Sequence, residues 1–149
     1  MPTYEVAPYE VSRIVFDLAN EFHRGFRKLK ISVLLATSGV RLTPIEAKIT
    51  SPYHRATGAS DVAIVISDAA WRRRNDAQRR AMIDHALCSI QVVELNGNLS
   101  TDSAGRPRIR RIPRDCSVGY MEPWRRWKND SIEAQSLAKL KSVAGDLAS

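Results

Sequence analysis

The sequence predicts an α+β fold, and three patterns carry this prediction. Residues 9–26 place apolar side chains at helical spacing, residues 62–66 are apolar on both faces, and residues 81–93 are apolar nearly all round. The first pattern indicates an amphipathic helix, the second an interior strand and the third a buried helix. With 149 residues, 44% of them hydrophobic, the chain is long enough to bury one core.

The remaining elements of the first half are strands. β-Branched and apolar residues predict a strand over residues 31–36. Residues 43–51 predict another strand, which Pro44 and Pro52 mark as short or as lying at a sheet edge. Together with residues 62–66, these segments predict a small mixed or antiparallel sheet of about three or four strands.

The helix after this sheet has the clearest start signal in the chain. Asn75 is a favourable N-cap residue, and Gln78 three positions later completes the pattern of a capping box. The apolar surroundings of the following residues place His85 and Ser89 in or beside the core.

Turns and a terminal helix complete the chain. Asn96-Gly97 and Ser103-Ala104-Gly105 are typical turn sequences and predict a short, basic hairpin arm. Ser131 is suited to cap a terminal helix. The apolar stripe of that helix consists of Leu137, Leu140, Ala144 and Leu147. We expect a domain over residues 1–128 and an amphipathic helix over residues 129–149 that packs on the domain or on a partner.

The segment 78–89 carries the most specific motif. Gln78-Arg79 and then Asp84-His85 follow Trp71 in the sequence. In this order the residues resemble the zinc helix of the putative phage metallopeptidase family, in which an aspartate precedes His-Glu-Leu-x-His. The resemblance covers residues 4–127 and implies a minimal zincin-like fold and a phage or prophage origin.

The motif departs from that family at two positions. In His-Glu-x-x-His, two histidines on one helix face bind zinc, and the glutamate activates the zinc-bound water. His85 keeps the first histidine, whereas Ala86 replaces the glutamate and Ser89 replaces the second histidine. A methyl group cannot accept a proton, and a neutral hydroxyl is a poor zinc ligand. We therefore predict no catalytic residue, no bound metal and no other cofactor.

A rebuilt zinc site is the alternative for this helix. His85 and Cys88 are one helical turn apart, and Cys116 or Glu94 could supply further ligands. The simpler expectation is a buried His85 that is hydrogen-bonded to Asp115 or to a main-chain carbonyl.

The other titratable side chains give weaker signals. His23 and His54 lack any ligand-like spacing, so we expect both at the surface or in turns. We expect both cysteines to be reduced thiols, because the sequence carries no secretory signal.

The chain is basic, with 23 Lys and Arg against 16 Asp and Glu, a net charge of +7 and a pI near 9.8. This balance favours a polyanion or an acidic protein surface as the partner. Arginine binds phosphate with two parallel hydrogen bonds, and tryptophan stacks on bases. The candidate partner contacts are Arg72, Arg73, Arg74, Arg79, Arg106, Arg108, Arg110, Arg111, Trp124, Arg125, Arg126 and Trp127. The same residues also fit solvated faces with the tryptophans in the core.

Three functions follow from these observations. The first is a catalytically inactive phage or prophage protein that acts as an interaction module on a host or phage protein with an acidic surface. By analogy with other small phage proteins, its target is host or defence machinery. The second is a nucleic-acid-binding protein, and the third is a zinc metallopeptidase with non-standard ligands. Because no apolar run approaches 20 residues and no signal peptide is recognisable, we expect a cytoplasmic protein without membrane contact.

Overall fold

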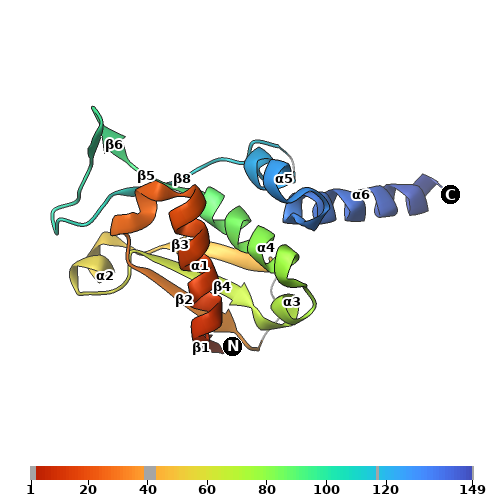
Figure 1. The fold of residues 1–149 in the computed structure, drawn as a ribbon, viewed down its shortest axis with the longest axis horizontal. Helices are drawn as coiled ribbons and strands as arrows, with labels where there is room; N and C mark the ends of the chain where they lie inside the picture. Colours follow the sequence, from red (N-terminus) through yellow and green to blue (C-terminus); the bar gives the residue numbers. More distant parts are fainter. Residues whose placement is uncertain (1–2, 39–42, 117, 149) are drawn as a thin grey trace.

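The structure is a computed structural model that describes residues 3–38, 43–116 and 118–148, with only the backbone of residues 142–148. A four-stranded sheet forms its centre, two helices cross one face of that sheet, and a helix at the C-terminal end extends away from it (Figure 1). The α+β class that the sequence predicts is confirmed.

The central sheet is mixed, with strands in the order β1-β2-β4-β3. Strands β2 (Ile31–Ala36) and β4 (Val62–Ser67) are parallel and occupy the middle. Strand β1 (Tyr4–Val6), which the sequence did not predict, pairs antiparallel with β2. Strand β3 (Ile45–Ile49) pairs antiparallel with β4 at the other edge. The predictions of an interior strand over residues 62–66 and an edge strand after Pro44 are confirmed.

Helices α1 (Tyr9–Phe22) and α4 (Asp76–Cys88) lie side by side on the sheet (Figure 1). Their contact and the sheet enclose the core, in which Leu18, Ile64 and Met82 are almost fully buried. Each such side chain contributes about 1.5–3 kcal/mol relative to an exposed one. The predicted capping box of α4 is confirmed, because the Asn75 side chain accepts from the Gln78 main chain and the Gln78 side chain accepts in return.

Two predicted helices are shorter than expected. The first ends at Phe22, and after His23 the chain continues as the short 3₁₀ helix η1 (Arg24–Lys28). The second ends at Cys88 rather than near residue 93, because the chain turns at Ser89 into strand β5 (Ile90–Val92). The apolar residues that follow Cys88 thus belong to a buried strand. Hydrophobic periodicity alone cannot distinguish such a strand from a continuation of the buried helix.

The arm after α4 consists of two small sheets. Strand β5 pairs antiparallel with β8 (Ile109–Arg111), and β6 (Glu94–Leu95) pairs with β7 (Asn98–Leu99). The hairpin turn at Asn96-Gly97 is confirmed, and both residues have the positive φ angles that this type of turn requires.

Four short helices lie outside the predicted elements: α2 (Pro52–Ala56), α3 (Asp68–Arg72), α5 (Met121–Trp127) and the 3₁₀ helix η2 (Lys128–Asp130). The predicted terminal helix is α6 (Ile132–Ala148), and the Ser131 hydroxyl caps it by accepting from the Ala134 main chain. Leu137 and Leu140 of its predicted stripe are exposed. The side chains of Ala144 and Leu147 lie outside the described residues, and the domain boundary at residue 128 stays a prediction.

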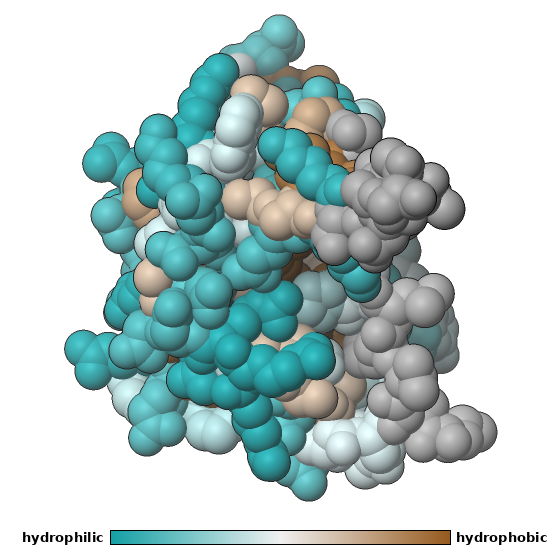
Figure 2. All heavy atoms as spheres, turned by 90° about the vertical axis from the view of Figure 1, so that its right-hand side faces the viewer, coloured by the Kyte–Doolittle hydropathy of each residue, from teal (hydrophilic) through white to brown (hydrophobic). Residues whose placement is uncertain are grey.

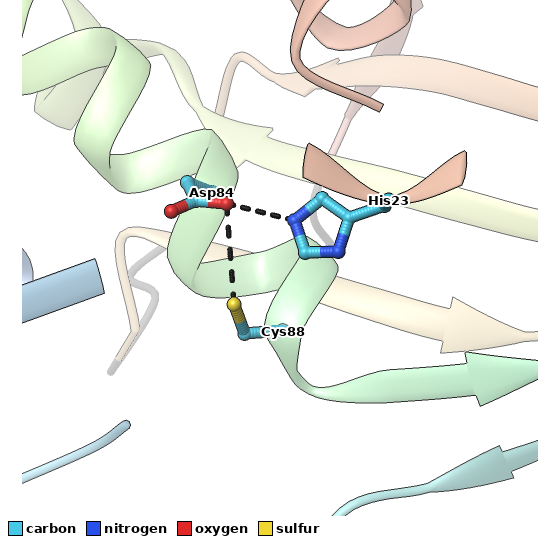
Figure 3. A group of neighbouring side chains, drawn as sticks. All are labelled: His23, Asp84 and Cys88. Atoms are coloured by element: carbon cyan, nitrogen blue, oxygen red, sulfur yellow. Dashed lines mark hydrogen bonds and ion pairs between the residues drawn. The ribbon is translucent and has the colours of Figure 1, made fainter. Parts of the chain in front are cut away.

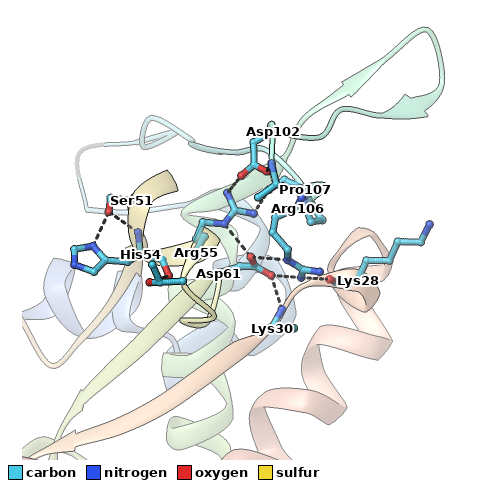
Figure 4. A network of polar contacts seen from close by, with 11 residues as sticks. Lys28, Lys30, Ser51, His54, Arg55, Asp61, Asp102, Arg106 and Pro107 are labelled. Atoms are coloured by element: carbon cyan, nitrogen blue, oxygen red, sulfur yellow. Dashed lines mark hydrogen bonds and ion pairs between the residues drawn. The ribbon is translucent and has the colours of Figure 1, made fainter.

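A buried carboxylate, Asp61, fixes the start of β4 to the basic arm (Figure 4). It accepts hydrogen bonds from the Arg55 and Arg106 guanidinium groups and from the main-chain nitrogen of Lys30. Arg55 also donates to the Pro107 carbonyl. Burial opposes the charge, but the bonds from Arg106, Lys30 and Arg55 outweigh it and hold the pKa of Asp61 below its usual value.

We predict that Asp61→Asn destabilises the fold by about 3 kcal/mol, because the buried Arg55 guanidinium then keeps only Asp102, at 3.7 Å, as its counter-charge. Urea unfolding measures the change in the free energy of unfolding. Glu122→Gln is the matched control, since its ion pair with Arg125 is exposed and such pairs contribute about 0–1 kcal/mol. Equal stability of the two variants would contradict the prediction.

Candidate functional site

The motif positions on α4 face a cavity. His85, Ala86 and Ser89 line a hollow of about 1030 Å³ that is also bounded by β3, by the connection from β8 to α5, and by α6. Their spacing on the last turns of α4 places them together on one side of the helix. The vestigial motif therefore lies where a ligand could reach it.

His85 is held by a buried glutamate from another element. Its Nδ1 is bonded to Oε2 of Glu133, which lies in the first turn of α6 and is 2% exposed. The ring also meets the edge of Tyr120, with 5.4 Å between ring centroids. The expectation that His85 bonds to Asp115 or a carbonyl is wrong, because α6 returns to α4 and brings Glu133 against the ring. Among the described residues, Nε2 of His85 has no hydrogen-bond partner.

Gly119 makes room for this carboxylate. A Cβ atom at position 119 would lie 2.3 Å from Oε2 of Glu133, so only glycine permits the contact. The other carboxylate oxygen, Oε1, is buried without a hydrogen-bond partner in the described part of the chain. His85, Gly119 and Glu133 thus form one packed unit.

The Ser89 hydroxyl is engaged within the helix. Its hydroxyl donates to the Ala86 carbonyl, one turn back along the helix. Its backbone is still in the helical region, with φ −78° and ψ −8°. A histidine at this position would therefore share a helix face with His85, whereas the serine satisfies its hydroxyl locally.

A second group of titratable side chains surrounds Asp84, the residue before His85 (Figure 3). The Asp84 side chain is fully buried and accepts from His23 Nε2 at 2.8 Å, Arg126 Nε at 2.8 Å and Trp127 Nε1 at 3.0 Å. Cys88 Sγ lies 3.9 Å from Asp84 Oδ1. His23, expected at the surface or in a turn, lies in the connection between α1 and η1, and only 12% of its side chain is exposed.

The charges around Asp84 are balanced without a metal. Burial opposes ionisation of Asp84, but the bonds from His23 and Trp127 and the charge of Arg126 hold its pKa below the usual value. Burial, together with the negative charge of Asp84, raises the pKa of the Cys88 thiol to about 12. The thiol is therefore protonated at neutral pH, and the carboxylate is already paired with a guanidinium.

A catalytic zinc ion takes three protein ligands and a water. Neither the residues beside the cavity nor the group around Asp84 fits this requirement. Beside the cavity, the free donor atoms are Nε2 of His85 and Oε1 of Glu133. His23, Asp84 and Cys88 form the one close group of three ligand-type side chains among the described residues. The structure does not bring Cys116 or Glu94 into a group with His85 and Cys88, so the rebuilt site is not formed.

The predicted partner contacts divide into inward and outward side chains. The inward ones bond to the fold itself: Arg74 to Ala70, Arg79 to Trp71, Arg106 to Asp61, Arg111 to Ala47, and Arg126 and Trp127 to Asp84. The outward ones are Arg72, Arg73, Arg108, Arg110, Trp124 and Arg125. Four of the outward side chains also have partners within the chain: Arg72 with Asp68, Arg108 with Thr101, Arg110 with Gln91 and Arg125 with Glu122. A role in partner binding stays a prediction for both sets.

One family matches the chain. The family described as putative phage metallopeptidase matches residues 3–146, which confirms the resemblance and extends it over α6 and Glu133. No curated protein and no solved structure matches the chain. Within the described residues, none of the helices has the length and apolar character needed to cross a bilayer.

We predict that Asp84→Asn lowers the stability of the fold by about 3–5 kcal/mol at neutral pH, because Arg126 loses its buried counter-charge. Since the pKa of Asp84 is lowered by folding, its contribution is complete above the unfolded value of about 3.9 and is lost as pH falls further. Urea unfolding between pH 7 and pH 2 should therefore show a smaller acid loss in the variant. Asp17→Asn, at an exposed position, is the control.

The raised pKa of Cys88 predicts a protected thiol. In a Cys116→Ser variant, we expect an aromatic disulfide reagent at pH 8 to modify Cys88 at least about 100-fold more slowly in the folded chain than in urea. Absorbance of the released thiolate measures both rates. Equal rates would show that Cys88 is not held in this environment.

Proposed function

Because the chain belongs to the putative phage metallopeptidase family and lacks two of the three motif side chains, we propose that it is a catalytically inactive member that acts as an interaction module. The proposal is supported by the sequence at the end of α4, where Ala86 replaces the general base and Ser89 replaces the second zinc ligand. Position 86 is 2% exposed and carries only a methyl group.

The loss of the general base is decisive for peptide hydrolysis. Such a base typically accelerates proton transfer by about 10²–10⁴-fold, and an alanine cannot replace it. Glu133 does not fill the role, because one oxygen is bonded to His85 and the side chain is buried beneath Gly119. A peptidase reaction at His85 would therefore lack both its metal and its base.

The cavity and the net charge of +7 support the binding of a protein partner as the function. A basic surface favours a partner with an acidic surface. By analogy with other small phage proteins, we infer that this partner is a host or phage protein and that binding blocks host or defence machinery.

The nucleic-acid alternative has weaker support. A nucleic-acid platform needs exposed aromatic side chains beside free guanidinium groups. In the Trp124–Trp127 segment, Trp124 is exposed, but Arg126 and Trp127 turn inward to Asp84. The segment therefore presents one aromatic ring rather than two.

We expect the purified chain to contain no stoichiometric zinc and to show no peptidase activity. The double variant Ala86→Glu with Ser89→His should gain zinc, because the new histidine lies four residues after His85 on the same helix face. Elemental analysis and titration calorimetry measure the metal. The matched control Ala86→Gln with Ser89→Asn adds similar bulk without zinc ligands.

One stoichiometric zinc ion in the natural chain, lost in His85→Ala, would overturn the proposal. Cleavage of peptides by the natural chain, abolished by the same substitution, would do so as well.

A further inference from the structure

We infer that the cavity above His85 is itself the partner site and that it receives an acidic peptide segment, an inference that rests on the function proposed above. The cavity is bounded by four separate parts of the chain, namely β3, α4, the β8–α5 connection and α6. Its volume of about 1030 Å³ matches the upper end of the range of ligand pockets, which is about 300–1,000 Å³.

The charged lining of this cavity is mainly positive. Arg111, Arg114 and Lys139 contribute three cations, and Glu46 contributes one carboxylate. All three basic residues are exposed, although the Arg111 guanidinium also donates to the Ala47 carbonyl. Neither Arg114 nor Lys139 has an ion pair within the described part of the chain. Cations that have no internal partner and border a hollow are suited to bind carboxylates from outside.

His85 adds a directed polar group at the cavity. Its Nδ1 is fixed by Glu133, and Tyr120 packs against the ring, so the ring orientation is defined. Nε2 is the remaining polar atom of the ring. The Glu133 carboxylate thereby fixes the orientation of the ring, in the way that a second-shell carboxylate orients a functional histidine.

The rest of the lining favours a peptide over nucleic acid. The lining also includes apolar side chains such as Ile45, Ile112 and Ile132. On the face of the molecule that Figure 2 shows, hydrophilic side chains dominate and apolar ones appear in the hollows between them. A phosphate backbone needs a continuous basic track with stacking rings, whereas acidic side chains flanked by apolar ones match a basic hollow with apolar walls.

The test is a selection of random ten-residue peptides displayed on particles, carried out with the full chain. We expect selected peptides to contain at least two Asp or Glu residues beside an apolar residue. Fluorescence anisotropy then gives the affinity of a selected peptide. We also expect its isosteric Asn and Gln counterpart to bind at least about tenfold more weakly, because charge-assisted bonds are replaced by neutral ones.

Two matched double variants locate the site. Arg114→Ala with Lys139→Ala removes two charges from the cavity, whereas Arg27→Ala with Lys28→Ala removes two exposed charges that do not line it. We expect the first pair to weaken peptide binding about tenfold or more and the second pair less than about twofold. We also expect the single variant Lys139→Glu to weaken peptide binding, because it replaces a cation at the cavity with an anion.

The outcomes separate this inference from the function on which it rests. Selection of no peptide or of neutral peptides, equal loss in both double variants, or equal competition by a single-stranded oligonucleotide would each overturn the cavity as an acidic-peptide site. None of these results would restore a metal or a base to α4. Zinc or peptidase activity in the natural chain would instead overturn the proposed function.

Discussion

The contacts of the buried Asp84 carboxylate connect the parts of the chain on which the site depends. Asp84 lies on α4, and its partners come from the end of α1, through His23, and from α5, through Arg126 and Trp127. A buried carboxylate without these donors would be strongly unfavourable, so the three segments are held to one arrangement. Since α6 follows α5 directly, this arrangement also determines where the first turn of α6 meets α4 and thus where Glu133 meets His85.

Asp84 and His85, which are neighbours on α4, consequently have different roles in the structure. Successive residues of a helix point about 100° apart, so Asp84 and His85 face different surroundings. Asp84 is enclosed by hydrogen-bond donors, whereas His85 borders the cavity with one ring nitrogen engaged. The substitutions that remove the peptidase motif lie on the side of His85, and the contacts that hold the fold lie on the side of Asp84. The departures from the motif at positions 86 and 89 thus leave the contacts of Asp84 in place.

Sequence reasoning succeeded where local rules decide the structure. The Asn75 capping box, the Asn96-Gly97 turn and the strand over residues 62–66 follow from side-chain chemistry within a few positions, and all three are present. It failed where a distant segment supplies the partner. Nothing in the spacing of His23 or Glu133 indicates that they meet α4, because their partners lie 61 and 48 residues away in the sequence. Several arginines assigned to a surface likewise donate hydrogen bonds to carboxylates or carbonyls that only the tertiary fold brings near.

The contact between Arg111 and Ala47 has a consequence for how the molecule behaves among its own copies. β3 is an edge strand, and the outward carbonyl of Ala47 is a group to which a foreign strand would pair. The Arg111 guanidinium donates to that carbonyl at 2.6 Å. A neighbouring chain would have to displace a cation before it could extend the sheet, so self-association into stacked, fibril-like sheets is disfavoured at high concentration.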